Sequence, residues 1–318
     1  MRPDSAVVTI SVGNIAMGGR GKTPLVALIA RLLVAAGERP AILSRGYGRR
    51  RREDGVTIVS DGTHVLADID RAGDEPLLLA RSVPGAAVLV CEQRAVAASL
   101  AATQFGSTIC VLDDGFQHRS MKRDVDIVAV APEDFDGRRM PFGRLRESPS
   151  ALGRADAVIV DGALDGARGL QTPGVMPPGL KTRGSTENMF TMTRHLGEPV
   201  SLDPDDRVPG EGASVVAVAG IAKPERFSRA LEQAGWRVAC LLAFRDHHRY
   251  SLADVRRIEQ AVQDESAVGV LTTEKDAMRL RRWRPFAVPV AAVPLTVRVE
   301  PAAGFESWLL GRVKERRS

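Results

Sequence analysis

The sequence AMGGRGKT, which ends at Thr23, has the composition and spacing of a phosphate-binding loop. In such a loop, backbone N–H groups and the start of the following helix surround phosphate oxygens. Lys22 would add a positive charge beside the β- and γ-phosphates, and the Thr23 hydroxyl would bind Mg²⁺. Ala16 stands where the general pattern has glycine, but Gly18 and Gly19 keep the turn flexible. These residues predict a nucleotide site rather than a chance glycine-rich turn.

Two adjacent carboxylates, Asp113 and Asp114, end the apolar run TICVLDD. P-loop proteins place a Mg²⁺-binding aspartate at the end of such a strand. Because neighbouring strand residues point in different directions, one carboxylate would bind the metal and the other its water shell or a basic neighbour. The alternative, a solvated turn after a strand, explains the pair less well in a chain that also carries a phosphate-binding loop.

A third carboxylate, Asp74, lies in the sequence AGDEPLLLAR. Pro76 marks a helix start, so Asp74 could be only the N-cap of that helix. Capping does not exclude chemistry, because a kinase that acts on a hydroxyl needs a carboxylate to accept its proton. His247 is the first of two histidines in FRDHHRYS, before a helix that Ser251 would cap. Loop histidines are commonly solvated surface residues, so both readings stay open at this point.

Arginines follow several of the predicted strands. Open α/β sheets bind ligands beyond the carboxyl ends of their strands, so arginines that converge there would suit a phosphorylated acceptor. Any single one of them is more commonly a solvated surface charge. The candidates are Arg45, Arg94, Arg119, Arg144 and Arg146.

The elements that must position these residues alternate between short apolar runs and helical patterns, which predicts a parallel sheet flanked by helices. The apolar spacing from Lys22 to Gly37 predicts a helix directly after the phosphate-binding loop. Alternating residues at 55–68 around an Asp61-Gly62 turn predict a β-hairpin. The other predicted strands are 6–12, 40–44, 86–91, 108–112, 125–130 and 156–160.

The length of 318 residues allows two domains. Residues 161–185 are rich in glycine and proline and predict a loop, and the segments NMFTMTRHL and GEPVSL then predict two connecting strands. A second α/β unit begins with the strand at 213–221. We predict a P-loop domain at 1–185, a two-stranded linker at 186–206, and a smaller α/β domain at 207–318 whose final helix could pack back on the first domain.

Composition excludes several classes of protein. Aromatic residues make up only 4% of the chain and do not alternate with basic ones, so a nucleic-acid stacking surface is not expected. Three scattered cysteines suggest neither a disulfide framework nor a zinc site, and they fit a reducing cytosol. The sequence has no run of 18 apolar residues, so no transmembrane helix is expected. We expect a monomer.

Eight motifs, in order, closely resemble the tetraacyldisaccharide 4′-kinase family of lipid A biosynthesis. They are SVGNIAMGGRGKTP, LSRGYG, GDEPLLLAR, LDDGFQHRSMKRDVDIV, RLRES, AVAGIAKPERF, FRDHHRY and LTTEKDAMRL. In that family the first P-loop position is not restricted to glycine, so Ala16 fits. The resemblance implies a P-loop NTPase-type fold, ATP and Mg²⁺, and transfer of the γ-phosphate to the 4′-hydroxyl of a tetraacyldisaccharide 1-phosphate, giving lipid IVA.

The resemblance also implies roles for individual residues. Asp74 matches the family's catalytic base, His247 matches its partner from the C-terminal domain, and Lys22 is the cation at the transferred phosphate. The residues implied in ATP binding are Ala16, Met17, Gly18, Gly19, Arg20, Gly21, Lys22 and Thr23. Those implied near the metal are Thr23, Asp113 and Asp114. Those implied in acceptor or phosphate contacts are Arg45, Tyr47, Glu75, Arg94, Gln117 and Arg146.

The resemblance further implies a cytoplasmic protein, peripheral to the inner membrane of a Gram-negative-type bacterium. The family usually begins with an apolar, membrane-associating helical segment, whereas here only MRPDS precedes the first strand. Either the start has been trimmed or the protein meets the membrane differently, through basic patches and exposed apolar residues. Ala222 and Lys223 stand where the family more often has glycine and asparagine, which concerns local loop conformation and not the reaction.

Other functions remain as alternatives. A nucleotide-dependent switch or metallochaperone would also use a P-loop, but a guanine-reading N-K-x-D loop is absent, because in TTEKDA Lys275 is followed at once by Asp276. A kinase of the same fold could act on a soluble, sugar-like acceptor. An inactive scaffold is disfavoured, because the phosphate-binding lysine and the candidate carboxylates occur together.

Overall fold

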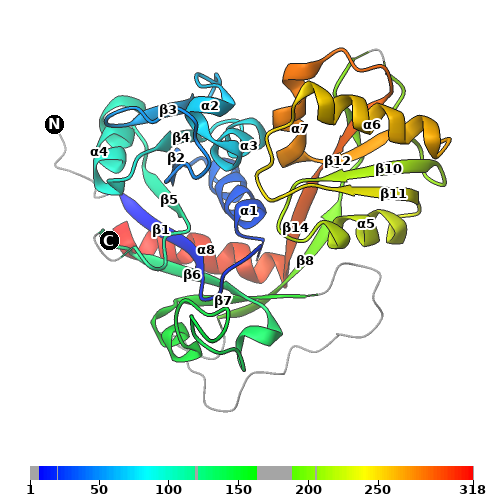
Figure 1. Ribbon diagram of the computed structural model, residues 1–318. Helices are drawn as coiled ribbons and strands as arrows, with labels where there is room; N and C mark the ends of the chain where they lie inside the picture. The colour runs from blue at the N-terminus through cyan, green and yellow to red at the C-terminus, as the bar shows by residue number, and fades with distance from the viewer. Residues whose placement is uncertain (1–6, 20, 119–120, 163–187, 205, 318) are drawn as a thin grey trace. The chain divides into compact units, whose positions relative to one another are not determined.

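The computed structural model describes residues 7–19, 21–118, 121–162, 188–204 and 206–317. The chain divides into two compact units (Figure 1). The large unit comprises residues 1–193 and 297–318, and the small unit comprises residues 194–296. The predicted loop at 161–185 lies almost entirely outside the described residues. Within the described residues, no helix is both long and apolar enough to cross a bilayer.

A largely parallel sheet organises the large unit. In the described part of the chain it has nine strands in the order β14-β8-β7-β6-β1-β5-β2-β4-β3. Every pairing from β8 to β4 is parallel. The strands are β1 (Val8–Asn14), β2 (Pro40–Ser44), β3 (Thr57–Asp61), β4 (Ala87–Val90), β5 (Ile109–Asp113), β6 (Val125–Val130), β7 (Ala157–Asp161), β8 (Met189–Leu196) and β14 (Leu295–Glu300). The central strands are buried on both faces, which explains their continuous apolar runs. The predicted P-loop-type α/β fold is therefore confirmed.

Helices cover this sheet. The longer ones are α1 (Lys22–Ala35), α3 (Asp74–Ser82), α4 (Arg94–Phe105) and α8 (Ala302–Arg317), and α2 (Ile69–Ala72) is a single turn. Helix α4 packs the small side chains Ala97 and Ala101 into a core with Leu43 of β2 and Leu89 of β4. Two 3₁₀ turns, Pro132–Asp134 and Pro149–Arg154, follow β6 and precede β7.

The predicted hairpin at 55–68 forms only in part. Strand β3 pairs antiparallel with β4, and the segment after the turn adds only an isolated bridge from Ser60 to Val65. The Asp61 carboxylate accepts hydrogen bonds from the backbone N–H groups of Thr63 and His64, both at 2.7 Å. These bonds close the turn. The chain then returns along β3 for a few residues, where the N–H of Leu66 donates to the carbonyl of Val59 at 2.8 Å, before it enters α2.

The chain passes between the two units inside two neighbouring strands. It leaves the large unit within β8 and returns within β14. Of the two strands proposed for the 186–206 linker, the first corresponds to β8. The second, β9 (Val200–Ser201), instead pairs antiparallel with β13 (Val290–Val293) in the sheet of the small unit. Its place beside β8 is taken by β14, which is about a hundred residues further along the chain.

The small unit is a second α/β layer. In the described residues its sheet has five strands in the order β11-β10-β12-β13-β9, including β10 (Ser214–Ala219), β11 (Arg237–Ala243) and β12 (Val270–Thr273). Helix α5 (Pro224–Gln233) packs on one face through Phe227 and Leu231. Helices α6 (Leu252–Asp264) and α7 (Glu274–Leu280) cover the other face, followed by a 3₁₀ turn at Arg281–Trp283. The predicted cap is confirmed, because Ser251 Oγ accepts a hydrogen bond from the N–H of Asp254.

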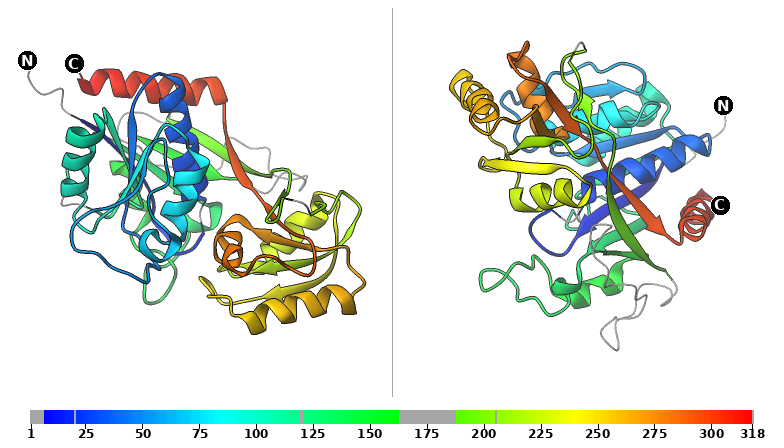
Figure 2. Two further views of the ribbon diagram at one scale, coloured as in Figure 1. Left: turned by 90° about the horizontal axis from the view of Figure 1, so that it is seen from above. Right: turned by 90° about the vertical axis from the view of Figure 1, so that its right-hand side faces the viewer.

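The last helix, α8, belongs to the large unit and lies against it (Figure 2). The end of α8 is anchored to the loop between α1 and β2, where Arg317 donates hydrogen bonds of 2.7 and 2.6 Å to the two carboxylate oxygens of Glu38. Near its start, Phe305 and Trp308 pack on Phe190 of β8. The contacts at both ends make α8 part of the large unit.

Glu38→Gln is expected to loosen the end of α8 in a pH-dependent way. The hydrogen bond from Arg317 is the main cause that holds the pKa of Glu38 below its ordinary value of 4.5. The pair therefore stabilises the fold above that value, and the stabilisation is lost as pH falls through the lower, folded-state pKa. We expect amide exchange in α8 to be about twofold faster in the variant at neutral pH, equivalent to about 0.5 kcal/mol, and we expect this difference to shrink as pH falls through the lowered pKa.

Hydrogen–deuterium exchange of both proteins at matched pH measures this effect. Glu315→Gln is the matched control, because Glu315 pairs with Arg312 within α8 and does not hold the helix to another element. Exchange in α8 that is the same in wild type and Glu38→Gln at neutral pH would contradict the anchor.

Candidate active site

The phosphate-binding loop connects β1 to α1, as predicted. Gly18 and Gly21 have φ angles of 107° and 69°, a left-handed region that disfavours other residues. Ala16 has no such angle, and its side chain is buried in a core cluster with Phe116 and Leu145. The first position of the loop is therefore part of the packing, and alanine fills it without strain.

Lys22, the first residue of α1, is fixed by two partners. Its ammonium group donates to Asn14 Oδ1 at 3.0 Å and to Asp114 Oδ1 at 2.7 Å. Asn14 is the last residue of β1 and also donates from Nδ2 to the carbonyl of Ala16 at 2.6 Å. One buried amide thus links the lysine to the backbone of the loop. The sequence motifs did not identify Asn14 as a site residue, although it stands two residues before the first loop position, Ala16.

Asp114 is the centre of a charged cluster. Its φ of 55° turns the residue away from the strand direction, and Arg146 Nη1 donates to both its oxygens at 3.2 and 3.0 Å. Burial alone would raise the pKa of the Asp114 carboxyl, but the charges and hydrogen bonds of Lys22 and Arg146 outweigh it and hold that pKa below its ordinary value. Asp114 is therefore ionised and neutralised by two cations.

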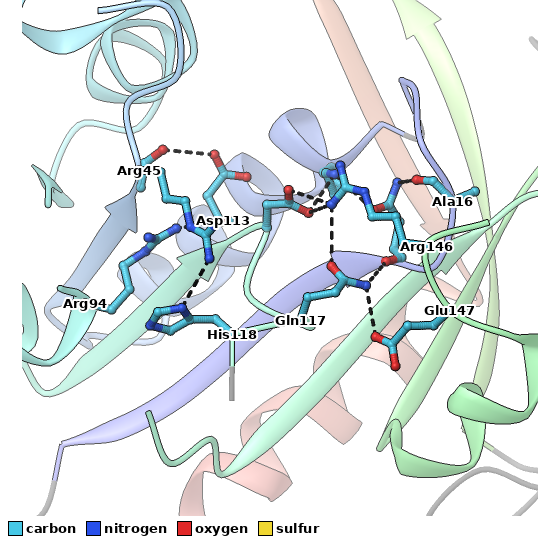
Figure 3. A network of polar contacts seen from close by, with 12 residues as sticks. Ala16, Arg45, Arg94, Asp113, Gln117, His118, Arg146 and Glu147 are labelled. Carbon is cyan, nitrogen blue, oxygen red and sulfur yellow. Dashed lines mark hydrogen bonds and ion pairs between the residues drawn. The ribbon is translucent and has the colours of Figure 1, made fainter. Parts of the chain in front are cut away.

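Gln117 connects this cluster to the segment after β6 (Figure 3). Its Nε2 donates to the carbonyl of Asn14 at 2.7 Å and to Glu147 Oε1 at 3.2 Å. The backbone N–H of Arg146 donates to the carbonyl of Ile15 at 2.7 Å. The RLRES motif is thus bound to the end of β1 by both backbone and side chains. Glu147 also pairs with Arg154 at 2.9 Å and was not singled out from the sequence.

Asp113 lies on a different set of contacts from its neighbour. It is the last residue of β5, and its Oδ2 accepts a long hydrogen bond of 3.4 Å from Ser44 Oγ at the end of β2. The backbone carbonyl of Asp113 accepts from Arg94 Nη2 at 3.2 Å. The two carboxylates therefore face different partners, as the strand geometry predicted.

Arg94 differs from a solvated surface arginine, because its residue is only 1% exposed. It is the first residue of α4 and also donates to the carbonyl of Cys91 at 3.5 Å. Burial, followed by the charge of Arg45, lowers the pKa of its guanidinium to about 10, which leaves it charged at neutral pH. This buried positive charge lies beneath Asp113, to whose backbone it is bonded, and the residue packs where β4, β5 and α4 meet.

The loop after β2 brings a second group of predicted residues together. Arg45 is exposed, and its Nη2 lies 3.3 Å from His118 Nδ1 (Figure 3). Tyr47 is exposed and contributes backbone to the packing around Gly73, where an added Cβ would lie 2.7 Å from the Tyr47 carbonyl. Asp74, the next residue, is 4% exposed. Its position corrects one expectation, because Gly73 is the N-cap and Asp74 is the first residue of α3, followed by Glu75.

His247 belongs to the small unit. Its φ of 58° is in the left-handed region, and its N–H donates to the carbonyl of Gly220 at 3.1 Å. Arg279 Nη2 lies 3.0 Å from its Nδ1. A guanidinium can only donate, so Nδ1 accepts and the ring proton of the neutral imidazole is on Nε2.

Three of the sequence motifs meet at this histidine loop. The carboxylate of Asp276, from the TTEKD motif, accepts from the N–H of Gly220 at 3.0 Å and from Thr273 Oγ1 at 2.6 Å. Asp276 is completely buried, and this burial raises the pKa of its carboxyl. The same residue pairs with Arg279 at 3.6 Å. The GIAK, DHH and TTEKD segments therefore form one structural unit that presents His247.

The large unit thus gathers Lys22, Thr23, Asp113, Asp114, Arg45, Arg94, Gln117 and Arg146 at the carboxyl ends of β1, β5 and β2. Asp74 and Glu75 lie at the start of α3, against the loop after β2. Met17 and Gly19 are exposed on the phosphate-binding loop. Arg20 and Arg119 lie outside the described residues.

The donor set of the predicted metal site suits Mg²⁺ bound together with a nucleotide. Among the described residues, no three His, Cys, Asp or Glu side chains form a group that could hold a metal ion. Magnesium commonly takes one or two protein ligands and completes its shell with water and phosphate oxygens. The Thr23 hydroxyl and the Asp113 carboxylate fit that pattern, whereas Asp114 is already neutralised by two cations.

This fold and this site define a P-loop nucleotide-binding protein. The chain matches the family model described as LpxK, Tetraacyldisaccharide-1-P 4′-kinase, over residues 2–314. A tetraacyldisaccharide 4′-kinase of Syntrophus aciditrophicus is 38% identical over 315 residues, which cover 96% of this chain and 84% of the relative. One of Anaeromyxobacter sp. is 40% identical over 289 residues, covering 87% and 74%.

A solved structure is also similar. LpxK from Aquifex aeolicus, in complex with ATP, is 31% identical, has a TM-score of 0.74 and is covered over 88% of its length by 96% of this chain. The chain belongs to the tetraacyldisaccharide 4′-kinase family, which confirms the resemblance found in the sequence.

Proposed function

We propose that this member of the family binds ATP at the phosphate-binding loop and transfers the γ-phosphate to the 4′-hydroxyl of a tetraacyldisaccharide 1-phosphate. The observation that carries the proposal is the position of Lys22 at the start of α1, held by Asn14 and Asp114. An ammonium group in this position can stabilise the charge that develops on the transferred phosphoryl group. Backbone N–H groups at the start of α1 would bind the remaining phosphate oxygens.

The Thr23 hydroxyl and the Asp113 carboxylate would hold the Mg²⁺ ion. When bound, the ion neutralises negative charge on the phosphates. Asp114 would have a different role. It already pairs with Lys22 and Arg146, so it would hold these two cations side by side. On this proposal, only one of the paired carboxylates is a metal ligand.

Asp74 would accept the proton of the attacking hydroxyl. A carboxylate at the start of α3, buried against the loop after β2, is held in a defined place by the packing of Gly73. His247 would act through this carboxylate, because Arg279 at Nδ1 leaves the ring proton of the neutral imidazole on Nε2, from which it would donate to Asp74. Orienting the base in this way favours the conformation in which the hydroxyl can attack.

The acceptor carries a phosphate and acyl chains, and different residues would recognise each part. Arg45 and Tyr47 belong to the loop after β2, and Glu75 follows Asp74 in α3; these three residues would contact the sugar and its phosphate. Arg146 and Gln117 would contact phosphate from the other side of the site. The acyl chains place the reaction at a membrane, so we propose a peripheral protein on the cytoplasmic face of the inner membrane.

Transfer from radiolabelled ATP to the lipid acceptor in detergent micelles tests the function. A soluble, deacylated form of the same sugar phosphate is assayed in parallel. Label in the lipid, with at least about tenfold lower kcat/KM for the deacylated sugar, supports the proposal, because buried acyl chains contribute binding. Preferential labelling of the soluble sugar would support a soluble-acceptor kinase, and ATP hydrolysis without labelled acceptor would support a nucleotide-dependent switch.

A further inference from the structure

An apolar tip flanked by arginines stands out on the surface of the large unit, in the loop at 138–146. Phe142 is 83% exposed and Met140 is 53% exposed, with the exposed Pro141 between them. Arg138, Arg139 and Arg144 are exposed on either side of this tip. Segments that lie at a membrane interface combine large exposed apolar side chains with several cations, and this loop has that combination.

The loop is built to expose this tip. Leu145 is buried in the core cluster that also holds Ile15 and Phe116. The N–H of Leu145 donates to the carbonyl of Arg138 at 3.0 Å, and the N–H of Met140 donates to the carbonyl of Leu145 at 2.9 Å. These bonds close the base of the loop, so the side chains between them are directed outward by a hydrogen-bonded turn.

The loop adjoins the phosphate-binding loop. The N–H of Met17 donates to the carbonyl of Arg144 at 2.8 Å, and Arg144 Nη2 donates to the carbonyl of Met17 at 3.2 Å. Two residues further on, Arg146 reaches Asp114. A surface at this place lies beside the site of phosphate transfer.

We propose that the 138–146 loop is the surface with which the protein lies on an anionic bilayer. This inference rests on the proposed function, because an acceptor whose chains stay in the bilayer must present its hydroxyl close to the membrane surface. Phe142 and Met140 insert among the lipid headgroups, and the arginines contact lipid phosphates. On this proposal the loop binds the surface of the bilayer and does not bind the acyl chains of a single acceptor molecule.

Binding to vesicles that lack the acceptor tests the proposal. Vesicles of phosphatidylcholine alone are compared with vesicles that also contain phosphatidylglycerol, by sedimentation at low and high salt. Wild type is expected to bind the anionic vesicles more tightly and to be released by salt. Phe142→Ser is expected to weaken binding roughly tenfold, and the double variant Arg138→Gln, Arg139→Gln about 30-fold.

The matched control is Arg51→Gln, Arg52→Gln, which removes two exposed arginines from the loop after β2 of the same unit. It is expected to bind as wild type does, and all variants should melt at the wild-type temperature. No binding by wild type, or equal losses in the two arginine pairs, would overturn the assignment, the latter by showing diffuse charge attraction.

An assay in detergent micelles separates this proposal from the proposed function. Transfer by the loop variants in micelles is expected to equal that of wild type, because their side chains lie outside the phosphate-transfer site. An acceptor KM raised in micelles with vesicle binding unchanged would assign the loop to the acceptor's chains and overturn the bilayer proposal. Vesicle binding without any transfer by wild type would overturn the proposed function and leave the membrane surface intact.

Discussion

Lys22→Ala is expected to lower kcat for phosphate transfer by about 10³-fold, because it removes a fixed positive charge at the transferred phosphate. The lysine is only 16% exposed and is held by Asn14 and Asp114, so its charge is positioned by the fold. The substitution should leave the fold intact, because Arg146 still neutralises Asp114. Initial rates with the lipid acceptor in micelles, at saturating ATP, measure the effect.

Lys122→Ala is the matched control for this substitution. Its side chain is 90% exposed and pairs at the surface with Asp124, so transfer should stay within about twofold of wild type. A Lys22→Ala protein that kept more than about a tenth of the wild-type kcat would show that the charge at this position does not stabilise the reaction. Thermal unfolding of all three proteins separates a loss of catalysis from a loss of structure.

Local sequence patterns were sufficient for the parts of this site that lie on one segment. The apolar run of β1, the glycines after it and the helical spacing from Lys22 depend on neighbouring residues, so they predict strand, loop and helix together. The same holds for Asp113 at the end of β5 and for the cap of α6. In each case a short-range rule of backbone geometry fixes the residue's place.

Long-range pairing is where the sequence was insufficient. Asp114 and Arg146 are 32 residues apart, and their contact requires the loop after β6 to return to the end of β1. The same limit explains the second strand of the connection, since β14 replaces the nearby β9 beside β8. The burial of Arg94 could not be predicted from its residue type either. An arginine is normally solvated, yet Arg94 is buried beneath Asp113.

The paired loss of Asp74 and His247 is the second large effect that we expect. Asp74→Asn and His247→Ala should each lower kcat by about 10²- to 10³-fold, since a positioned general base commonly contributes that much. If the histidine works by orienting the carboxylate, the double variant should be no more than about threefold slower than the slower single variant. Two independent roles would instead multiply the losses.

His248→Ala is the control that lies closest in the chain. His248 pairs with Asp254 at 3.1 Å and stacks on Phe244, so its loss should reduce the stability of the small unit and leave kcat within about threefold of wild type. His247 is held differently, in a left-handed backbone conformation with Arg279 at its Nδ1. A conformation of this kind costs of order 1–3 kcal/mol and persists when the surroundings compensate for it. Multiplicative losses in the double variant, or a His247→Ala protein as fast as wild type, would refute the dyad and leave Asp74 to act alone.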